Sequence, residues 1–139
     1  MIMGLFAIFD VAGSGMSAQT IRLNTVASNM ANAEVVSGTE EGAYHARQPV
    51  FSAVMRAMGG NHATVPVQVT GVVESQAPVN KQYSPAHPQA DEDGYIYMSN
   101  VNMIEEMANM ISASRSYQSN VEVANTSKQL LLDTLRLGQ

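Results

Sequence analysis

The sequence predicts a mainly α-helical protein with a small β-strand or irregular middle segment, in which long N- and C-terminal helices pair as a coiled-coil-like bundle. Two observations support this fold class. Apolar residues recur at alternating spacings of four and three near both ends, and all five prolines lie between residues 34 and 99. We therefore expect a terminal helical domain, residues 1–33 plus 100–139, and an extended or β-rich middle segment, residues 34–99.

The N-terminal segment combines helical periodicity with very few charges. Asp10 and Arg22 are its only charged residues up to position 33. The alternating spacing, which only Gln19 interrupts, is followed by Ile2, Leu5, Phe9, Ala12, Met16, Leu23, Val26, Met30 and Ala33. A solvated helix carries more charge than this. We expect a helix from about residue 4 to residue 32, with an outer face that neighbours cover.

The middle segment has turn and strand signals in place of helical periodicity. Its prolines are Pro49, Pro66, Pro78, Pro85 and Pro88. Short strands are predicted at Val65–Val69, continuing through Val72 and Val73, and at Tyr95–Met98 after the turn sequence Asp93-Gly94. Residues 59–62 read as a loop tip. Helices are not expected here.

The C-terminal segment repeats the apolar spacing, with Ser114 and Lys128 as polar interruptions. The stripe consists of Met103, Met107, Met110, Tyr117, Val121, Ala124, Leu131 and Leu135, and Ile104, Ile111 and Leu132 widen it. Either Asn100 or Asn102 can cap the start of this helix, Glu105 and Glu106 suit its first turn, and Gly138 suits its end.

Two apolar stripes of similar length most economically cover each other, in a parallel or an antiparallel pair. The N-terminal helix is weak alone, because Gly13 and Gly15 each cost about 1 kcal/mol relative to Ala. Such a helix is expected to order fully only when neighbours pack on it. The alternative is an ordinary buried helix of a small monomeric α+β domain.

Composition excludes several classes of function. A net charge of −5 without a Lys or Arg cluster argues against a nucleic-acid partner. The absence of Cys excludes disulfides, thiolate catalysis and cysteine zinc sites. The apolar run at Met1–Phe9 is too short to cross a membrane, and it lacks the preceding basic residues and the cleavage site of a secretory signal.

No group of residues predicts an enzyme, a metal site, a cofactor or a small-molecule substrate. The acidic run from Asp91 to Gly94 lacks the Glu that closes a calcium-binding loop, since Asn102 stands at position twelve. We interpret it as a solvated turn. His45, His62 and His87 are far apart and lack metal-ligand spacing, so they are expected to be ordinary surface residues.

Two stretches resemble the axial proteins of the bacterial flagellum, the rod, hook and hook-associated family, and most closely its small proximal rod subunits. ASNMANA at residues 27–33 is similar to the Asn-x-Ala-Asn signature that ends the family's N-terminal helix. Residues 100–139 are similar to the family's C-terminal helix, with matching positions at Glu106, Met107, Arg115, Tyr117, Asn120, Leu135, Leu137 and Gly138. The similarity extends through VVESQAP and HPQADEDGYIYM in the middle segment. Two departures are the acidic Glu40-Glu41 insertion and Ser99, where relatives tend to have Pro.

This resemblance implies a structural subunit that assembles helically with other rod subunits and with copies of itself. It also implies passage through the flagellar type III export apparatus without a cleaved signal, and assembly in the periplasmic rod. The alternative is a soluble coiled-coil adaptor or export chaperone. The expected assembly interface comprises Leu5, Phe9, Met16, Leu23, Val26, Asn29, Met30, Asn32, Met107, Met110, Arg115, Tyr117, Asn120, Val121, Leu131 and Leu135.

Overall fold

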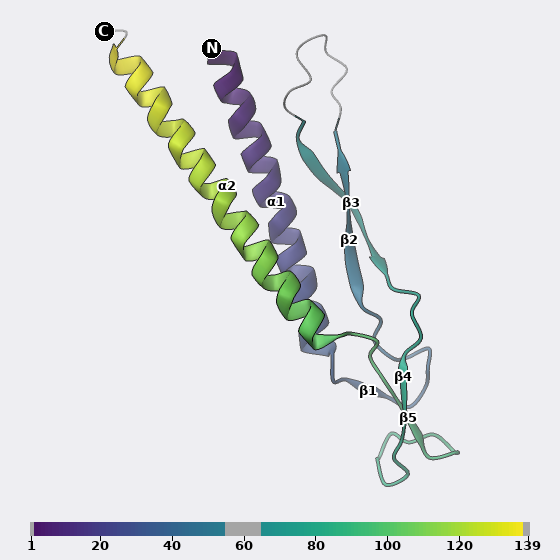
Figure 1. Cartoon of the computed structure of the whole chain (residues 1–139). Coiled ribbons are helices and arrows are strands. Elements are labelled where there is room, and N and C mark those ends of the chain that lie inside the picture. Colours follow the sequence, from purple (N-terminus) through teal and green to yellow (C-terminus); the bar gives the residue numbers. More distant parts are fainter. Residues whose placement is uncertain (1, 55–64, 138–139) are drawn as a thin grey trace.

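A computed structural model of the chain describes residues 2–54 and 65–137, with side chains from residue 6 onward. Two long helices lie side by side, and the short strands of the middle segment lie beside α1 and beyond the ends of the helices (Figure 1). In chain order the elements are α1 (Ile2–Asn32), β1 (Val36–Ser37), β2 (Arg47–Ala53), β3 (Val67–Glu74), β4 (Asn80–Tyr83), β5 (Tyr95–Met98) and α2 (Met103–Leu137).

The two helices run antiparallel, so that the two ends of the chain lie at the same end of the molecule (Figure 1). Helix α1 lies between α2 and the β2–β3 hairpin and packs on both. The predicted helical termini and β-containing middle segment are therefore confirmed. Of the two orientations that the sequence left open, the structure has the antiparallel one.

The strands form two small antiparallel sheets. Strands β2 and β3 pair in register from Arg47 opposite Glu74 to Ala53 opposite Val67, with an irregularity between Val50 and Phe51. The second sheet has the order β1-β5-β4. It lies beyond the ends of the helices that join the middle segment (Figure 1).

The predicted strands are partly confirmed. The strand expected at Tyr95–Met98 is β5, and the Val-rich region is β3. The sequence did not predict β1, β2 or β4, because none of them has an uninterrupted apolar alternation. The predicted loop tip at residues 59–62 lies outside the described residues.

Asn102 is the residue that caps α2. Its Oδ1 accepts hydrogen bonds from the backbone N–H groups of Ile104 at 3.1 Å and Glu105 at 3.4 Å. The other candidate, Asn100, joins two loops instead. Its Oδ1 accepts from the Ala46 N–H at 2.7 Å, and its Nδ2 donates to the Ala77 carbonyl at 2.8 Å.

The acidic run forms a tight turn before β5. The Asp91 carboxylate accepts hydrogen bonds from the N–H of Tyr95 at 2.7 Å and of Asp93 at 3.1 Å. Gly94 has φ = 80°, which glycine adopts without the strain of a side chain. The bond from the Tyr95 N–H is the main cause that lowers the pKa of Asp91. The Asp91 carboxylate therefore stabilises the turn.

The described core consists mainly of small side chains. Its buried apolar members are Ala12, Ala18, Val26, Ala33, Ala43, Ala46, Ile96 and Ala113. Small residues let two helices approach closely, and α2 lies close to α1 at Gly15. A Cβ atom built on Gly15 would lie 2.9 Å from Nδ2 of Asn120 on α2, whereas one on Gly13 would meet nothing within 4 Å.

The two glycines should therefore respond oppositely to the same change. Gly13→Ala should raise the free energy of unfolding by about 0.5–1 kcal/mol, because alanine has the higher helix propensity and the site is open. Gly15→Ala should gain less or lose stability, because the new methyl group displaces Asn120. Urea unfolding followed by circular dichroism would measure both. Equal stabilisation by the two substitutions would contradict close packing at Gly15. In the double variant Gly15→Ala/Asn120→Ala, the smaller residue at position 120 should relieve the clash.

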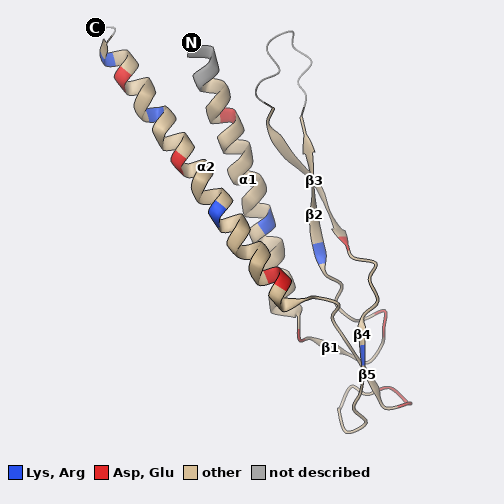
Figure 2. Cartoon of the chain, in the orientation of Figure 1, with Lys and Arg blue, Asp and Glu red and all other residues tan. Residues whose placement is uncertain are grey.

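Charge is sparse on α1 but not on α2. Figure 2 shows long uncharged stretches on α1 and charged residues spaced along α2, with two acidic residues where α2 begins. These are Glu105 and Glu106, and Arg136 lies in the last turn. Neither helix of the described chain has a long enough apolar stretch to cross a membrane.

Candidate assembly interface

The fully buried residues of α2, which packs on α1, are small or polar. Glu106, Ala113 and Ser127 are its buried residues, and they follow a heptad-like spacing of seven and fourteen. These positions are displaced by one residue from Met107, Ser114 and Lys128, which the predicted stripe had placed toward α1. We correct that expectation for these positions: Glu106, Ala113 and Ser127 are buried in their place, and Met107 is left 50% exposed, whereas Met103, Met110 and Leu131 of the predicted stripe are partly buried.

Polar groups cross between the two helices at several levels. Arg22 of α1 donates a hydrogen bond through its guanidinium to Oδ1 of Asn109 at 2.9 Å. Asn120 packs against Gly15, about two helical turns from Arg22 along α1. Such groups fix how two helices align, because any other register leaves them without partners.

Asn29 joins α1 to the start of the hairpin. Its side chain is 1% exposed. Its Nδ2 donates to the Arg47 carbonyl at 2.8 Å, and its Oδ1 accepts from the Arg47 N–H at 2.9 Å and from the Tyr44 hydroxyl at 3.0 Å. The amide thus binds the backbone of β2 as a neighbouring strand would. Asn32, the other asparagine of the signature, only donates to the Ser28 carbonyl of its own helix, at 2.8 Å.

A second face of α2 is apolar and open to solvent. We call it the outer stripe, and it consists of the exposed Ile104, Met107, Ile111, Leu132 and Leu135 and the half-buried Val121. Ile104 is 80% exposed, Ile111 55% and Leu135 61%. Consecutive members of the outer stripe are three, four, ten or eleven residues apart, and these intervals place them on one side of the helix. Half of them belong to the predicted interface, and the others are the residues that widened the predicted stripe.

The remaining predicted interface residues are distributed over both helices. Val26 and Asn29 are buried in the fold. Those that are partly buried are Phe9, Met16, Leu23, Met30, Asn32, Met110, Asn120 and Leu131, whereas Arg115 and Tyr117 are exposed. The side chain of Leu5 lies outside the described residues. A role of these residues between subunits stays a prediction.

Sequence reasoning missed Tyr44, Arg47 and Glu106 as a group around Asn29. Tyr44 and Arg47 lie 15 and 18 residues from Asn29 along the chain. The bonds to Arg47 use backbone atoms, which carry no residue-type signal. The Asn-x-Ala-Asn signature was the one indication that this position is special.

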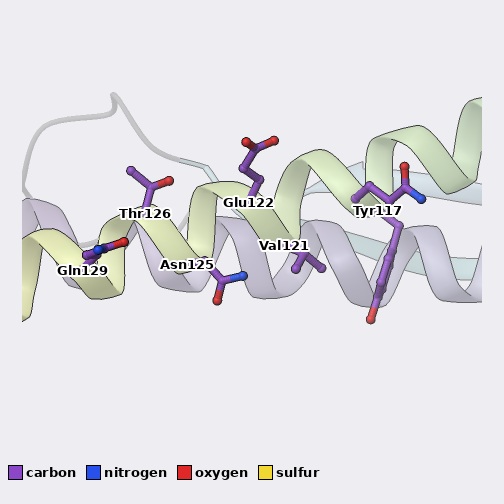
Figure 3. Close-up of a pocket in the computed structure, with 7 residues that line it drawn as sticks. Tyr117, Val121, Glu122, Asn125, Thr126 and Gln129 are labelled. Carbon is purple, nitrogen blue, oxygen red and sulfur yellow. The ribbon is translucent and has the colours of Figure 1, made fainter.

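Two shallow hollows lie along α2. One is lined by Tyr117, Gln118, Val121, Glu122, Asn125, Thr126 and Gln129. Figure 3 shows that Tyr117 and Val121 point to one side of the helix, whereas Glu122 and Thr126 point to the other. Side chains that diverge from a single helix do not enclose a small molecule.

The residues considered for metal or catalytic chemistry do not converge. No group of three or more His, Asp or Glu residues in the described chain could hold a metal ion. His45 is half-buried, with Nδ1 at 3.1 Å from the Ser75 carbonyl oxygen. His62 lies outside the described residues.

Comparison with known proteins identifies relatives along the whole chain. The family model for flagella basal body rod proteins matches residues 9–38. The model for the C-terminal part of the flagellar basal body rod proteins FlgE, FlgF and FlgG matches residues 92–137. These two matches cover the end of α1 with its asparagine signature, and β5 with α2.

Curated relatives match over nearly their full lengths. Flagellar basal-body rod protein FlgC of Salmonella typhimurium (strain LT2) is 52% identical over 137 residues, which span 99% of this chain and 100% of the relative. The FlgC of Escherichia coli O6:H1 is 53% identical over the same shares. That of Borreliella burgdorferi is 32% identical over 151 residues, 99% of each chain. The chain therefore belongs to the family of flagellar basal-body rod proteins that includes FlgC.

Proposed function

We propose that this chain is a structural subunit of the flagellar basal-body rod, which assembles with other rod subunits and with copies of itself through its terminal helices. The observation that carries the proposal is the outer stripe. The 35-residue helix α2 fully buries only Glu106, Ala113 and Ser127, and it leaves several large apolar side chains exposed to solvent, among them Ile104, Ile111 and Leu135. Contiguous exposed apolar surface on a folded chain marks an interaction site.

The occupant that fits this stripe is another helix. Along α2 the outer stripe lies one position from the face that packs on α1, so the helix has two adjacent contact faces. A helix with two such faces suits a layer of parallel or antiparallel helices better than an isolated pair. We infer coiled-coil-like packing between subunits, with residues 1–33 and 100–139 as the axial core and residues 34–99 beside it.

Open-ended assembly follows from using different faces on each side. When one surface of a subunit contacts another surface of the next, the contacts repeat along a screw axis and do not close. The subunit therefore needs no catalytic group, cofactor or small-molecule ligand to fulfil its role. Membership in the rod family supports this function over a soluble adaptor or export chaperone.

Family membership also supports the inferred location. We infer that the chain passes through the flagellar type III export apparatus without a cleaved signal and is incorporated in the periplasmic part of the rod. The near absence of charge on α1, with only Asp10 and Arg22, is compatible with a helix that neighbours surround in the assembly.

Purified hook–basal bodies provide the test. A tagged chain should co-purify with them in an immunoblot while a cytosolic marker does not, and its N-terminal peptide should retain the start of the sequence in mass spectrometry. A chain that stays in the cytosol of cells with complete flagella would contradict the rod function. A truncated N-terminus would contradict only the export route.

A further inference from the structure

Glu106 is a buried acidic residue at the point where α1, α2 and the start of the hairpin meet. It lies in the first turn of α2 and is 7% exposed. Its Oε2 atom is buried and has no hydrogen-bond partner among the described residues. A buried carboxylate oxygen without a donor is costly when it is charged, and much less so when the group is neutral.

The surroundings of Glu106 favour the neutral form. Burial is the largest influence and raises the pKa of Glu106, and the neighbouring charge of Glu105 raises it further. Hydrogen bonding to the Asn29 side chain and the charge of Arg22 oppose the rise without cancelling it. Arg22 is partly engaged elsewhere, since its guanidinium donates to Asn109 at 2.9 Å.

The β2–β3 hairpin offers few hydrogen-bond donors that could offset the cost of burying the Glu106 carboxylate. Arg47 presents its backbone to Asn29, and its guanidinium pairs with Glu74 at 3.2 Å. The Tyr44 hydroxyl donates to Asn29 Oδ1 at 3.0 Å. The donors that Tyr44 and Arg47 present at this junction are therefore occupied by other acceptors.

We propose that Glu106 is a proton-binding site that makes the junction of α1, α2 and β2 sensitive to pH, with tighter docking when its carboxyl group is protonated. The ligand is the proton itself, because the unpartnered oxygen is closed to larger groups. This property belongs to the single chain and does not depend on the rod function.

The direction of the pH effect follows from proton linkage. A carboxyl group with a raised pKa holds more protons in the folded chain than in the unfolded chain, from about its ordinary value of 4.5 up to the raised value. Through that window the free energy of unfolding falls as pH rises. Asp91, whose pKa is lowered, acts oppositely, and its contribution is lost only as pH falls below its ordinary value of 3.8.

Urea unfolding of the full chain at pH values from about 4 to 8 would test the proposal. The wild type should lose stability as pH rises above 4.5, and Glu106→Gln should remove this loss and be more stable than the wild type at neutral pH. Glu105→Gln is the matched control, since it removes a neighbouring exposed carboxylate. It should keep most of the pH dependence.

A direct titration makes the test independent of whether the variant folds. The side-chain carboxyl carbon of Glu106, observed by NMR in the wild type, should titrate with a midpoint above 4.5. A midpoint at or below that value would overturn the proposal. So would parallel stability curves for the wild type and a folded Glu106→Gln variant.

Discussion

Replacing Ile111 with Asp should prevent incorporation of the chain into the rod and leave the isolated chain folded. Ile111 is 55% exposed, so a carboxylate at this position stays hydrated in the free subunit. When a neighbouring helix covers the outer stripe, the same carboxylate is buried without a partner. The cost is several kcal/mol, which corresponds to a loss of about 100-fold or more in the affinity of a subunit for its site.

Ser112→Asp is the matched control for this prediction. It adds the same charge in the same turn of α2, but at a position rotated by about 100° from Ile111 and outside the outer stripe. Motility in soft agar and immunoblots of hook–basal bodies would measure assembly, and circular dichroism would verify the fold. Normal incorporation of a folded Ile111→Asp subunit would exclude the outer stripe as an assembly surface.

The two helices were predictable because periodicity and missing charge are local signals. The face of α2 that packs on α1 could not be predicted in the same way. Its sequence contains two stripes one position apart, and the apolar one, with Met107, is the more conspicuous. The structure turns Ala113 and Ser127 toward α1 because small residues allow the close approach seen at Gly15. Side-chain hydrophobicity alone cannot predict whether close packing of small residues or burial of a larger apolar area decides which face of α2 meets α1.

The middle segment shows the same division between local and non-local signals. Strand β5 was predicted because YIYM follows an Asp-Gly turn. Strand β2, with the sequence RQPVFSA, contains a proline and polar residues, and its conformation depends on pairing with β3. The candidate interface was predicted as a set of stripe residues. The junction at Asn29 was not, because it requires the distant backbone of Arg47.

Removing the Asn29 side chain should destabilise the isolated chain more than any other single asparagine substitution in α1. Asn29→Ala would leave the Arg47 N–H and the Arg47 carbonyl without their side-chain partner, and the Tyr44 hydroxyl would keep only the Ser28 hydroxyl, at 3.3 Å. Each buried polar group without a partner costs about 1–3 kcal/mol, although water entering the site recovers part of this. We expect the free energy of unfolding to fall by about 3 kcal/mol.

The signature provides its own control. Asn32→Ala makes the same chemical change three residues later, and it removes one hydrogen bond, to the Ser28 carbonyl of the same helix. That carbonyl is also within reach of water, because Asn32 is only partly buried. The change should cost less than about 1 kcal/mol. Urea unfolding of the two variants at the same pH would compare them.

The comparison also separates stability from assembly. If Asn29 acts by holding α1 to β2, Asn29→Ala should weaken protection of the β2 amides from hydrogen exchange, and protection in the middle of α2 should change less. Equal losses of stability in Asn29→Ala and Asn32→Ala would contradict the backbone-binding role of Asn29. A stable Asn29→Ala chain that fails to assemble would instead place the signature in a contact between subunits.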